Sequence, residues 1–425
     1  MFSRVLCVFY AGLLMAQAQS APDPAAIAKK AVDLLVGGKY SDLFQMFSPD
    51  GQAANPEAAL ARIGAQIKTY GAVESEGQPS VTKPGANSIV VIPVKFATQN
   101  INFTVAVTPA GQVALILQRP GETVWQRPPY SKPDAFRERA VVVGTGDWKL
   151  PATLTAPAGN GPFPGVVLVH DSGPNDRDET FGVCKPFKDL AEGLASRGIA
   201  VLRYEKRARQ YSARMAGMTG KTIDEETTED AVAAIALMRT EKDIDPQHVY
   251  LLGHSLGGYI APRIAAEDGK LAGIIIFAGN ARPLEDLIVD QAEYMGINGK
   301  QLEMVKALAA RVKALEPADA DAPPIMNMPV SFLLDLKGYD PVASAKKLPI
   351  PMLILQGERD FQVNMKDFNL WKSGMSGRKD ITFHSYPALN HLFVAGTGKS
   401  TEAEYRKPGH VDAAVIDDVA KWLGK

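Results

Sequence analysis

The hydrophobic residues of the chain follow two different patterns, which divide it into two parts. In the first part they recur every three or four residues up to Tyr70, which predicts helices, and runs rich in β-branched residues follow. A Pro-Ala-Gly turn joins the last two of these runs as a hairpin. We expect a small α+β domain over residues 21–119, with strands at 88–96, 102–107 and 112–118.

In the second part, residues 138–425, continuous apolar strands alternate with helical segments. Strands that are apolar at every position are buried on both faces, which is typical of a parallel sheet covered by helices. We therefore expect an α/β fold with a doubly wound, mostly parallel sheet. Helical, methionine-rich sequence interrupts the alternation at 282–347 and predicts a lid insertion at the C-terminal edge of this sheet. The predicted strands are 166–170, 200–204, 249–253, 273–278, 351–356 and 382–386, and the predicted helices are 187–196, 223–239, 256–266 and 411–423.

Residues 120–137 join the two parts. They include Pro128, Pro129 and Pro133 and show no hydrophobic period. Proline-rich sequence without periodicity is typical of a linker between domains. We therefore expect a linker over this range.

The first residues of the chain have the pattern of a signal peptide. An apolar run from Val5 to Ala16 follows an arginine, and small residues at Ala16, Ala18 and Ser20 offer cleavage sites. The run is shorter than the roughly 20 residues that a membrane-spanning helix needs, so we expect no stable membrane span. We expect residues 1–20 to be a signal peptide and the protein to be exported, either periplasmic or secreted. An uncleaved N-terminal anchor is the alternative.

The composition narrows the class of protein. The 425 residues carry 46 Lys and Arg against 47 Asp and Glu, a formal net charge of -1. Without an excess of positive charge there is no field to hold a nucleic acid, so we expect no nucleic-acid partner. Only two cysteines are present, and Cys7 lies inside the predicted signal peptide. Cys184 is then left alone, which excludes an intramolecular disulfide in the mature chain.

A Gly-His-Ser-Leu-Gly sequence at 253–257 lies between a predicted strand and a predicted helix. This is the context of a nucleophile elbow, in which a serine occupies a tight, strained turn and neighbouring glycines let the substrate approach. We predict that Ser255 is a nucleophile. A tight turn with an inert serine is the alternative.

A serine nucleophile needs a histidine as base and a carboxylate to orient that histidine. In this chain order, serine then acid then histidine, only three histidines lie late enough. His384 lies within a predicted strand and His410 precedes the last helix, whereas His391 lies in the loop after the final strand. We therefore predict His391 as the base.

For the acid we consider the loop at the carboxyl end of the strand 351–356, because functional residues collect at that end of α/β sheets. We prefer Asp360 in this loop. Glu358 and Asp367 remain alternatives.

Acyl transfer also needs N–H donors for the negative oxygen that develops. We assign the backbone N–H groups of Leu256, directly after the nucleophile, and Ser172, in the loop after the strand 166–170. Asp176, Arg177 and Asp178 in that loop resemble a metal cluster, yet the arginine among them favours a bracing network of ion pairs. We expect no metal and no cofactor.

Four motifs carry a resemblance to the α/β-hydrolase superfamily over roughly residues 138–425, and within it to secreted esterases of the serine aminopeptidase-like branch. They read HDSGPNDRD, RYEKRARQYS, GHSLGGYIAPRIA and GERDFQV. The resemblance implies Ser255, Asp360 and His391 as the catalytic triad. Such relatives usually have glycine where this chain has Asp171, and where it has Ala208 and Gln210. Residues 25–118 resemble a domain of unknown function that is similar to the nuclear-transport-factor-2 fold.

Together these features predict a serine hydrolase that cleaves small carboxylic esters of short to medium acyl chain through an acyl-serine intermediate. An amidase or peptidase with the same triad is the alternative, and an inactive binding protein of this fold is a weaker one. Methionines of the insertion suit an adaptable acyl pocket: Met295, Met304, Met326 and Met328. We expect the N-terminal domain to be accessory, with homo-oligomers forming through it.

Overall fold

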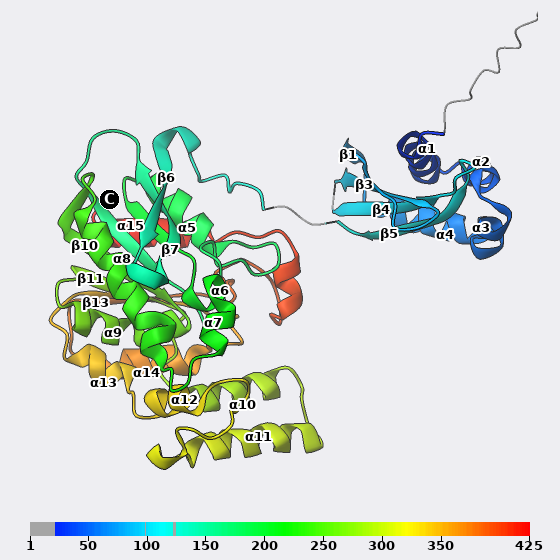
Figure 1. The fold of residues 1–425 in the computed structure, drawn as a ribbon. Helices are drawn as coiled ribbons and strands as arrows, with labels where there is room; N and C mark the ends of the chain where they lie inside the picture. Colours follow the sequence, from blue (N-terminus) through cyan, green and yellow to red (C-terminus); the bar gives the residue numbers. More distant parts are fainter. Residues whose placement is uncertain (1–21, 98, 122–124) are drawn as a thin grey trace, which may run out of the picture. The chain divides into compact units, whose positions relative to one another are not determined.

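The computed structural model describes residues 22–97, 99–121 and 125–425, so the predicted signal peptide at 1–20 lies outside the described residues. Contacts divide the chain into two compact units, with the division between Thr123 and Val124 (Figure 1). Among the described residues, no helix combines the length and the apolar character that crossing a membrane requires.

The described part of the N-terminal unit consists of four helices followed by an antiparallel sheet, in the order that the sequence predicts. The order of the strands in the described part is β1-β3-β4-β5. β2 pairs with residues 89–91 of β3, on the same edge of β3 as β1, which pairs with residues 94–96. Alternate residues of β3 and β4 pack against helix α1 in a core separate from that of the other unit. The elements are α1 (Pro24–Val36), α2 (Tyr40–Met46), α3 (Pro49–Ala54), α4 (Glu57–Lys68), β1 (Val73–Glu76), β2 (Ser80–Thr82), β3 (Ser88–Phe96), β4 (Asn100–Val107) and β5 (Val113–Pro120).

The C-terminal unit contains an eight-stranded sheet with the order β13-β12-β11-β10-β8-β9-β7-β6. Its strands pair in parallel from β13 to β9, while β7 and β6 are antiparallel additions at one edge. The predicted doubly wound, mostly parallel sheet is thus confirmed. The strands are β6 (Phe136–Val143), β7 (Leu150–Pro157), β8 (Phe163–Val169), β9 (Ala200–Tyr204), β10 (Ile244–His254), β11 (Gly273–Phe277), β12 (Met352–Gly357) and β13 (Ile381–Tyr386).

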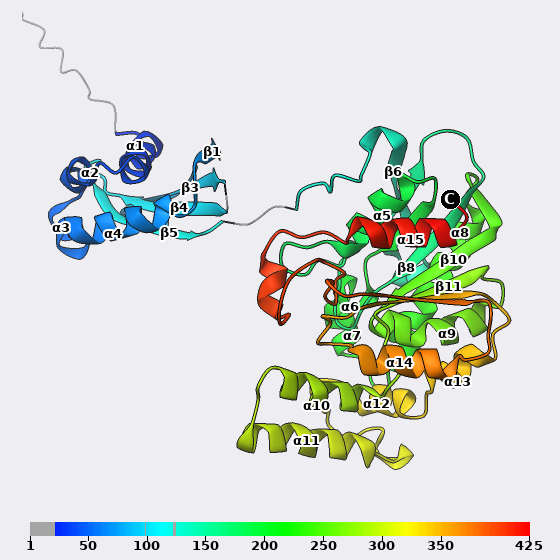
Figure 2. The ribbon, with the colours of Figure 1, turned by 180° about the vertical axis from the view of Figure 1, so that it is seen from behind.

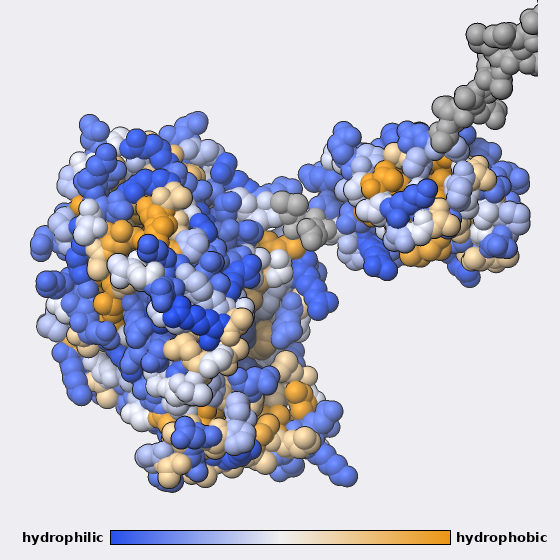
Figure 3. Space-filling model, in the orientation of Figure 1, coloured by the Kyte–Doolittle hydropathy of each residue, from blue (hydrophilic) through white to orange (hydrophobic). Residues whose placement is uncertain are grey.

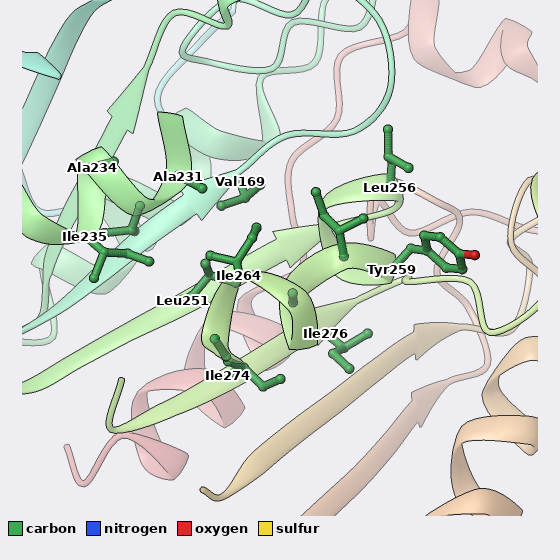
Figure 4. Packing of buried hydrophobic residues seen from close by; sticks show 14 of the residues in the cluster. Val169, Ala231, Ala234, Ile235, Leu251, Leu256, Tyr259, Ile264, Ile274 and Ile276 are labelled. Carbon is green, nitrogen blue, oxygen red and sulfur yellow. The ribbon is translucent and has the colours of Figure 1, made fainter. Parts of the chain in front are cut away.

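Helices cover both faces of this sheet, which explains why its central strands are apolar at every position. On β8, Val167 and Val169 belong to the core beneath α8, α9 and α14, while Val166 and Leu168 belong to the core beneath α5 and α15. Figure 4 shows the first of these cores and Figure 2 shows α5 beside α15. The helices are α5 (Pro186–Ala195), α6 (Arg207–Gln210), α7 (Ser212–Ala216), α8 (Glu229–Thr240), α9 (Leu256–Asp268), α14 (Met365–Gly374) and α15 (Ala413–Trp422).

The predicted insertion is mostly helical and lies between β11 and β12. Figures 1 and 2 show α10, α11 and α12 together at one end of the C-terminal unit, outside the layers that cover the sheet. We call residues 282–347 the lid. Its elements are α10 (Leu284–Tyr294), α11 (Gly299–Lys313), the 3₁₀ turn η4 (Pro317–Asp319), α12 (Val330–Lys337) and α13 (Pro341–Lys346).

Residues 125–131, within the range predicted as a linker, pack on α5 of the C-terminal unit. Arg127 forms two hydrogen bonds with Glu192 of α5, at 2.6 and 3.2 Å, and Ser131 Oγ donates a third to the same carboxylate at 2.6 Å. Trp125 donates its indole N–H to Asp189 at 2.8 Å. Both carboxylates are buried, so residues 125–131 supply the partners that this face of α5 needs.

Candidate active site

Ser255 lies between the end of β10 and the start of α9, as the elbow sequence predicts. Its backbone has φ 52° and ψ -114°, a conformation that residues other than glycine rarely adopt. The serine N–H donates to the carbonyl of Phe277 on the neighbouring strand at 2.9 Å, and this bond helps to hold the strained turn.

Two glycines of the elbow are required by close packing. A Cβ atom on Gly253 would lie 2.2 Å from the carbonyl oxygen of Gly257, and one on Gly257 would lie 2.3 Å from the carbonyl oxygen of Val169. The second contact brings the start of α9 against the end of β8. Because Leu256 is the first residue of α9, its N–H lies at the positive end of this helix, beside the loop that follows β8.

His391 and Asp360 come together from the loops after β13 and β12. His391 Nδ1 lies 2.7 Å from Asp360 Oδ2, and both side chains are buried. Asp360 Oδ1 in turn accepts the N–H groups of Gln362 and Val363 at 2.8 and 3.0 Å. His391 Nε2 is buried and has no hydrogen-bond partner among the described residues. A buried, unpaired imidazole nitrogen is unusual and is suited to a proton acceptor.

The other candidate histidines have different neighbours. His384 Nδ1 lies 2.8 Å from Asp418 on the surface, and His410 Nδ1 lies 3.2 Å from Asp189. Neither is paired with a carboxylate of the loop after β12.

The two alternative acids also have structural partners of their own. Glu358 accepts a hydrogen bond from the hydroxyl of Ser385 at 2.8 Å. Asp367 accepts the N–H groups of Ala281 and Arg282 at 3.0 Å and an ion pair from the Arg282 side chain at 2.8 Å. Asp367 thus anchors the chain where the lid begins, and Asp360 is the one of the three that contacts His391.

Ser255 and Leu256 line a pocket of about 540 Å³. The lid forms much of its wall, with apolar side chains of α10 and α12 that include Leu287, Ile288 and Phe332. Met328 also lines it, but the other methionines expected there do not. Met295 and Met304 are exposed, whereas Met326 packs against the core. Figure 3 shows hydrophobic residues at the surface of the C-terminal unit at the end where the lid lies.

The loop after β8 differs from the sequence prediction at Ser172. Its backbone N–H does not point free into the pocket but donates to Oδ1 of Asp171 at 2.5 Å. Asp171 Oδ2 lies 3.8 Å from His391 Nε2. The side chain of Asp171 therefore occupies the donor that we assigned to the substrate oxygen.

Comparison with known proteins places the chain. The family model described as "Serine aminopeptidase, S33" matches residues 182–396. Esterase EstD of Thermotoga maritima is 41% identical over 336 residues, which cover 78% of this chain and 78% of that protein. The chain belongs to the serine aminopeptidase S33 family of α/β hydrolases.

Solved structures similar to the hydrolase include other esterases. Est1E from Butyrivibrio proteoclasticus is 17% identical with a TM-score of 0.45, covering 67% of this chain and 99% of that one. The esterase domain of a Rhodothermus marinus protein is 17% identical with a TM-score of 0.42, covering 67% of this chain and 97% of that one.

In the hydrolase, the strongest electrostatic effects act on His391. Burial disfavours its imidazolium form, but the negative charges of Asp360 and Asp171 outweigh burial and raise the pKa of His391 to about 10. Burial also opposes ionisation of Asp171, yet His391 holds the pKa of this carboxyl well below its ordinary value. The ionised carboxylate and the imidazolium therefore stabilise one another.

A second buried pair, Glu179 and His254, was not found by the sequence reasoning. Glu179 Oε1 accepts the N–H of Asp171 at 2.7 Å, and its Oε2 lies 2.8 Å from His254 Nδ1. His254 Nε2 lies 3.0 Å from the carbonyl oxygen of His391. A carbonyl only accepts, so Nε2 carries a proton, and the pair shares a further proton between Nδ1 and the carboxyl group. The pair of Glu179 and His254 thus connects three segments: the loop after β8, the elbow and the loop of His391.

The charged residues that resemble a metal cluster brace their loop instead. Asp176 accepts both the N–H and the hydroxyl of Thr180, at 2.9 and 2.8 Å, and Arg177 pairs with Glu205 at 2.8 Å. Asp178 pairs with Lys185 at 2.9 Å. In the described ranges, no group of three His, Cys, Asp or Glu residues is arranged to hold a metal ion.

Proposed function

We propose that this hydrolase cleaves carboxylic esters through an acyl-serine intermediate. The observation that carries the proposal is the pairing of His391 Nδ1 with Asp360, which leaves Nε2 without a hydrogen bond, together with the strained elbow of Ser255 at the wall of a pocket. Membership of a serine hydrolase family and 41% identity to an esterase support it.

In this mechanism His391 Nε2 takes the proton of the Ser255 hydroxyl as its oxygen attacks the ester carbonyl. The C–O double bond opens to an oxyanion, which the N–H of Leu256 stabilises at the start of α9. When the carbonyl re-forms, the alcohol leaves with the proton from His391. Water then attacks the acyl-serine with His391 again as base, and the acid is released.

Short to medium acyl chains fit the pocket best. Its volume of about 540 Å³ lies within the range of small-molecule sites, and apolar side chains of the lid contribute to its wall. A pocket of this kind stabilises an acyl chain mainly by removing apolar surface from water.

A panel of substrates and a covalent label test the function. Purified protein is assayed with p-nitrophenyl esters of increasing chain length and with aminoacyl anilides, and is treated with a fluorophosphonate. We expect ester turnover, labelling at Ser255 by mass spectrometry, and loss of both in Ser255→Ala. Faster cleavage of anilides than of esters would identify an amidase, and labelling at another residue would move the nucleophile.

We further propose that the N-terminal unit is an accessory domain of the nuclear-transport-factor-2 type through which copies of the chain associate, and that residues 1–20 direct export. Its separate core supports the first proposal and the sequence pattern supports the second. Sedimentation analysis of the full chain tests the association. N-terminal sequencing of protein from the periplasm or the medium tests export and locates the cleavage site.

A further inference from the structure

Asp171 is a charged residue in a place where acyl transfer needs positive polarity. It follows β8 and lines the pocket beside Ser255 and Leu256, and only 7% of its surface is exposed. One carboxylate oxygen accepts the Ser172 N–H at 2.5 Å, and the other lies 3.8 Å from His391 Nε2.

This arrangement resembles the way a carboxylic acid product would bind to such a site. One oxygen of the product would take an oxyanion donor and the other would face the imidazole that accepts the next proton. The side chain of Asp171 makes both contacts from within the protein. Because a substrate oxyanion would need the same donor and would lie near the same negative charge, the two compete.

We propose that the Asp171 carboxylate limits the rate of the hydrolase and sets the pH dependence of that rate. It occupies the Ser172 donor and holds His391 in its protonated, inactive form. This inference rests on the proposed function of Ser255 and His391. The role needs no change of fold, since turning the Asp171 side chain away would free the donor.

Several titratable groups face His391. Among them, Asp171 is the carboxylate that can be removed to change the charge around His391 while the triad stays intact. Asp360 faces Nδ1 from the loop after β12 and orients the ring. The ring of His254 lies 4.7 Å from that of His391, between centroids, and His254 shares a proton with Glu179. Tyr405 faces the same loops, and burial raises the pKa of its hydroxyl, which stays neutral. Asp171 approaches Nε2, the atom that must accept the serine proton.

The pKa directions agree with this geometry. Burial alone would keep His391 neutral, but the two carboxylates raise its pKa to about 10, and so the active, neutral form increases as pH rises toward that value. When Asp171 is neutral, only Asp360 opposes the lowering of the His391 pKa by burial. The acidic limb of the rate profile should then move to lower pH.

Two substitutions separate the charge of Asp171 from its hydrogen bond. Asp171→Asn removes the charge but keeps an oxygen that can accept the Ser172 N–H, whereas Asp171→Ala removes both. Asp176→Asn is the matched control: it removes one charge from the same loop, where the carboxylate binds Thr180 rather than His391. For all four proteins, kcat/KM for p-nitrophenyl acetate is measured from about pH 5 to about pH 11, so that the limb and the plateau of the wild type both fall within the range, and circular dichroism checks folding.

We expect Asp171→Asn to shift the acidic limb to lower pH by about one unit or more, and to raise kcat/KM at pH 7 about tenfold. Asp171→Ala should show the same shift and also a higher plateau, up to about a hundredfold, because it frees an oxyanion donor. Asp176→Asn should leave the limb in place.

A folded Asp171→Asn whose limb is unmoved, or a folded Asp171→Ala with a lower plateau than the wild type, would overturn the proposal while leaving the ester hydrolase intact. If instead neither the wild type nor the Asp171 variants cleave any ester and the fluorophosphonate leaves Ser255 unlabelled, the proposed function fails and this inference fails with it.

Discussion

At the residue scale, buried carboxylates of similar appearance in the sequence have different tasks. Asp360 and Asp367 are both almost completely buried and lie seven positions apart. Asp360 contacts His391, while Asp367 accepts four hydrogen bonds from Ala281 and Arg282, where the lid segment begins. Removing the charge from each should therefore change a different property of the protein.

We expect Asp360→Asn to lower kcat by about ten-thousandfold, because the amide favours the wrong tautomer of His391. Asp367→Asn should lower the melting temperature, because Arg282 loses its buried partner, with a smaller effect on kcat. Glu358→Gln serves as the control, since this side chain binds Ser385 at the surface. Steady-state kinetics and thermal unfolding distinguish the three, and a larger loss of kcat in Glu358→Gln would mean that Asp360 is not the acid.

A second pair of substitutions tests the contact between Glu179 and His254. In Glu179→Gln the amide oxygen can accept the Asp171 N–H while the NH₂ group donates to a neutral His254, so every hydrogen bond is retained. Glu179→Ala leaves both partners unpaired in a buried place. Loss of one member of a buried pair costs about 3–5 kcal/mol, so we expect Ala to lower the free energy of unfolding by that amount and Gln by much less.

Urea denaturation measures these free energies, and kcat reports whether the three loops stay aligned. Equal stability of the Gln and Ala variants would show that the network contributes little.

At the scale of single elements, the elbow and the lid position the chemistry. The elbow brings the start of α9 against β8 through a contact that only glycine permits. The lid places side chains of α10 and α12 around the pocket that Ser255 lines. The first element sets the geometry of the reaction and the second sets the space for the acyl chain.

Gly257→Ala should disrupt the elbow, because the added Cβ would lie 2.3 and 2.8 Å from the carbonyl oxygens of Val169 and His170. The start of α9 must then move away from β8 and take the N–H of Leu256 with it. We expect kcat to fall about a hundredfold or more, as when an oxyanion donor is lost. Gly338→Ala, at a glycine where a Cβ would meet nothing within 4 Å, is the control and should keep full activity.

Phe332→Ala should change which esters are preferred. Phe332 lies on α12, is 8% exposed and lines the pocket. Truncation would extend the pocket, so we expect the optimum of kcat/KM to shift toward longer acyl chains, with acetyl esters little affected. Met304→Ala is the comparison within the lid, because this residue is 66% exposed and does not line the pocket. An unchanged chain-length profile in Phe332→Ala would exclude α12 from acyl recognition.

At the scale of the whole molecule, the chain forms two units with separate cores, and every proposed catalytic residue lies in the second. That unit includes the residues from Trp125 onward, because Trp125, Arg127 and Ser131 satisfy buried carboxylates on α5. The functional boundary therefore depends on hydrogen bonds and not on the end of the proline-rich range.

A chain that starts at Val124 should fold and hydrolyse p-nitrophenyl acetate, since it retains the triad and the partners of α5. A chain that starts at Glu138 leaves Glu192 buried without Arg127 and Ser131. We expect its free energy of unfolding to be lower by about 3–5 kcal/mol, the cost of leaving a buried charge unpaired. Urea denaturation of the two chains tests this, and equal stability would place residues 124–137 outside the folded unit.

The amino-acid sequence by itself determined the order of the elements, the mostly parallel sheet, the position of the lid and the elbow at Ser255. These features depend on short-range rules: apolar runs, helical periods and a turn whose glycines lie within five residues. The antiparallel strands β6 and β7 escaped prediction. β6 is the exposed edge strand and carries polar residues, and β7, although mostly buried, has prolines and threonines that interrupt its apolar pattern.

Only the tertiary structure decided which acid contacts His391, that Asp171 occupies the Ser172 donor, and that Glu179 and His254 join three loops. The physical reason is distance along the chain. Asp171 and His391 are 220 positions apart, and Glu179 and His254 are 75 apart, so no local pattern relates them. Their charges interact because the ends of β8, β10, β12 and β13 meet at one edge of the sheet, where burial makes each unpaired polar atom costly.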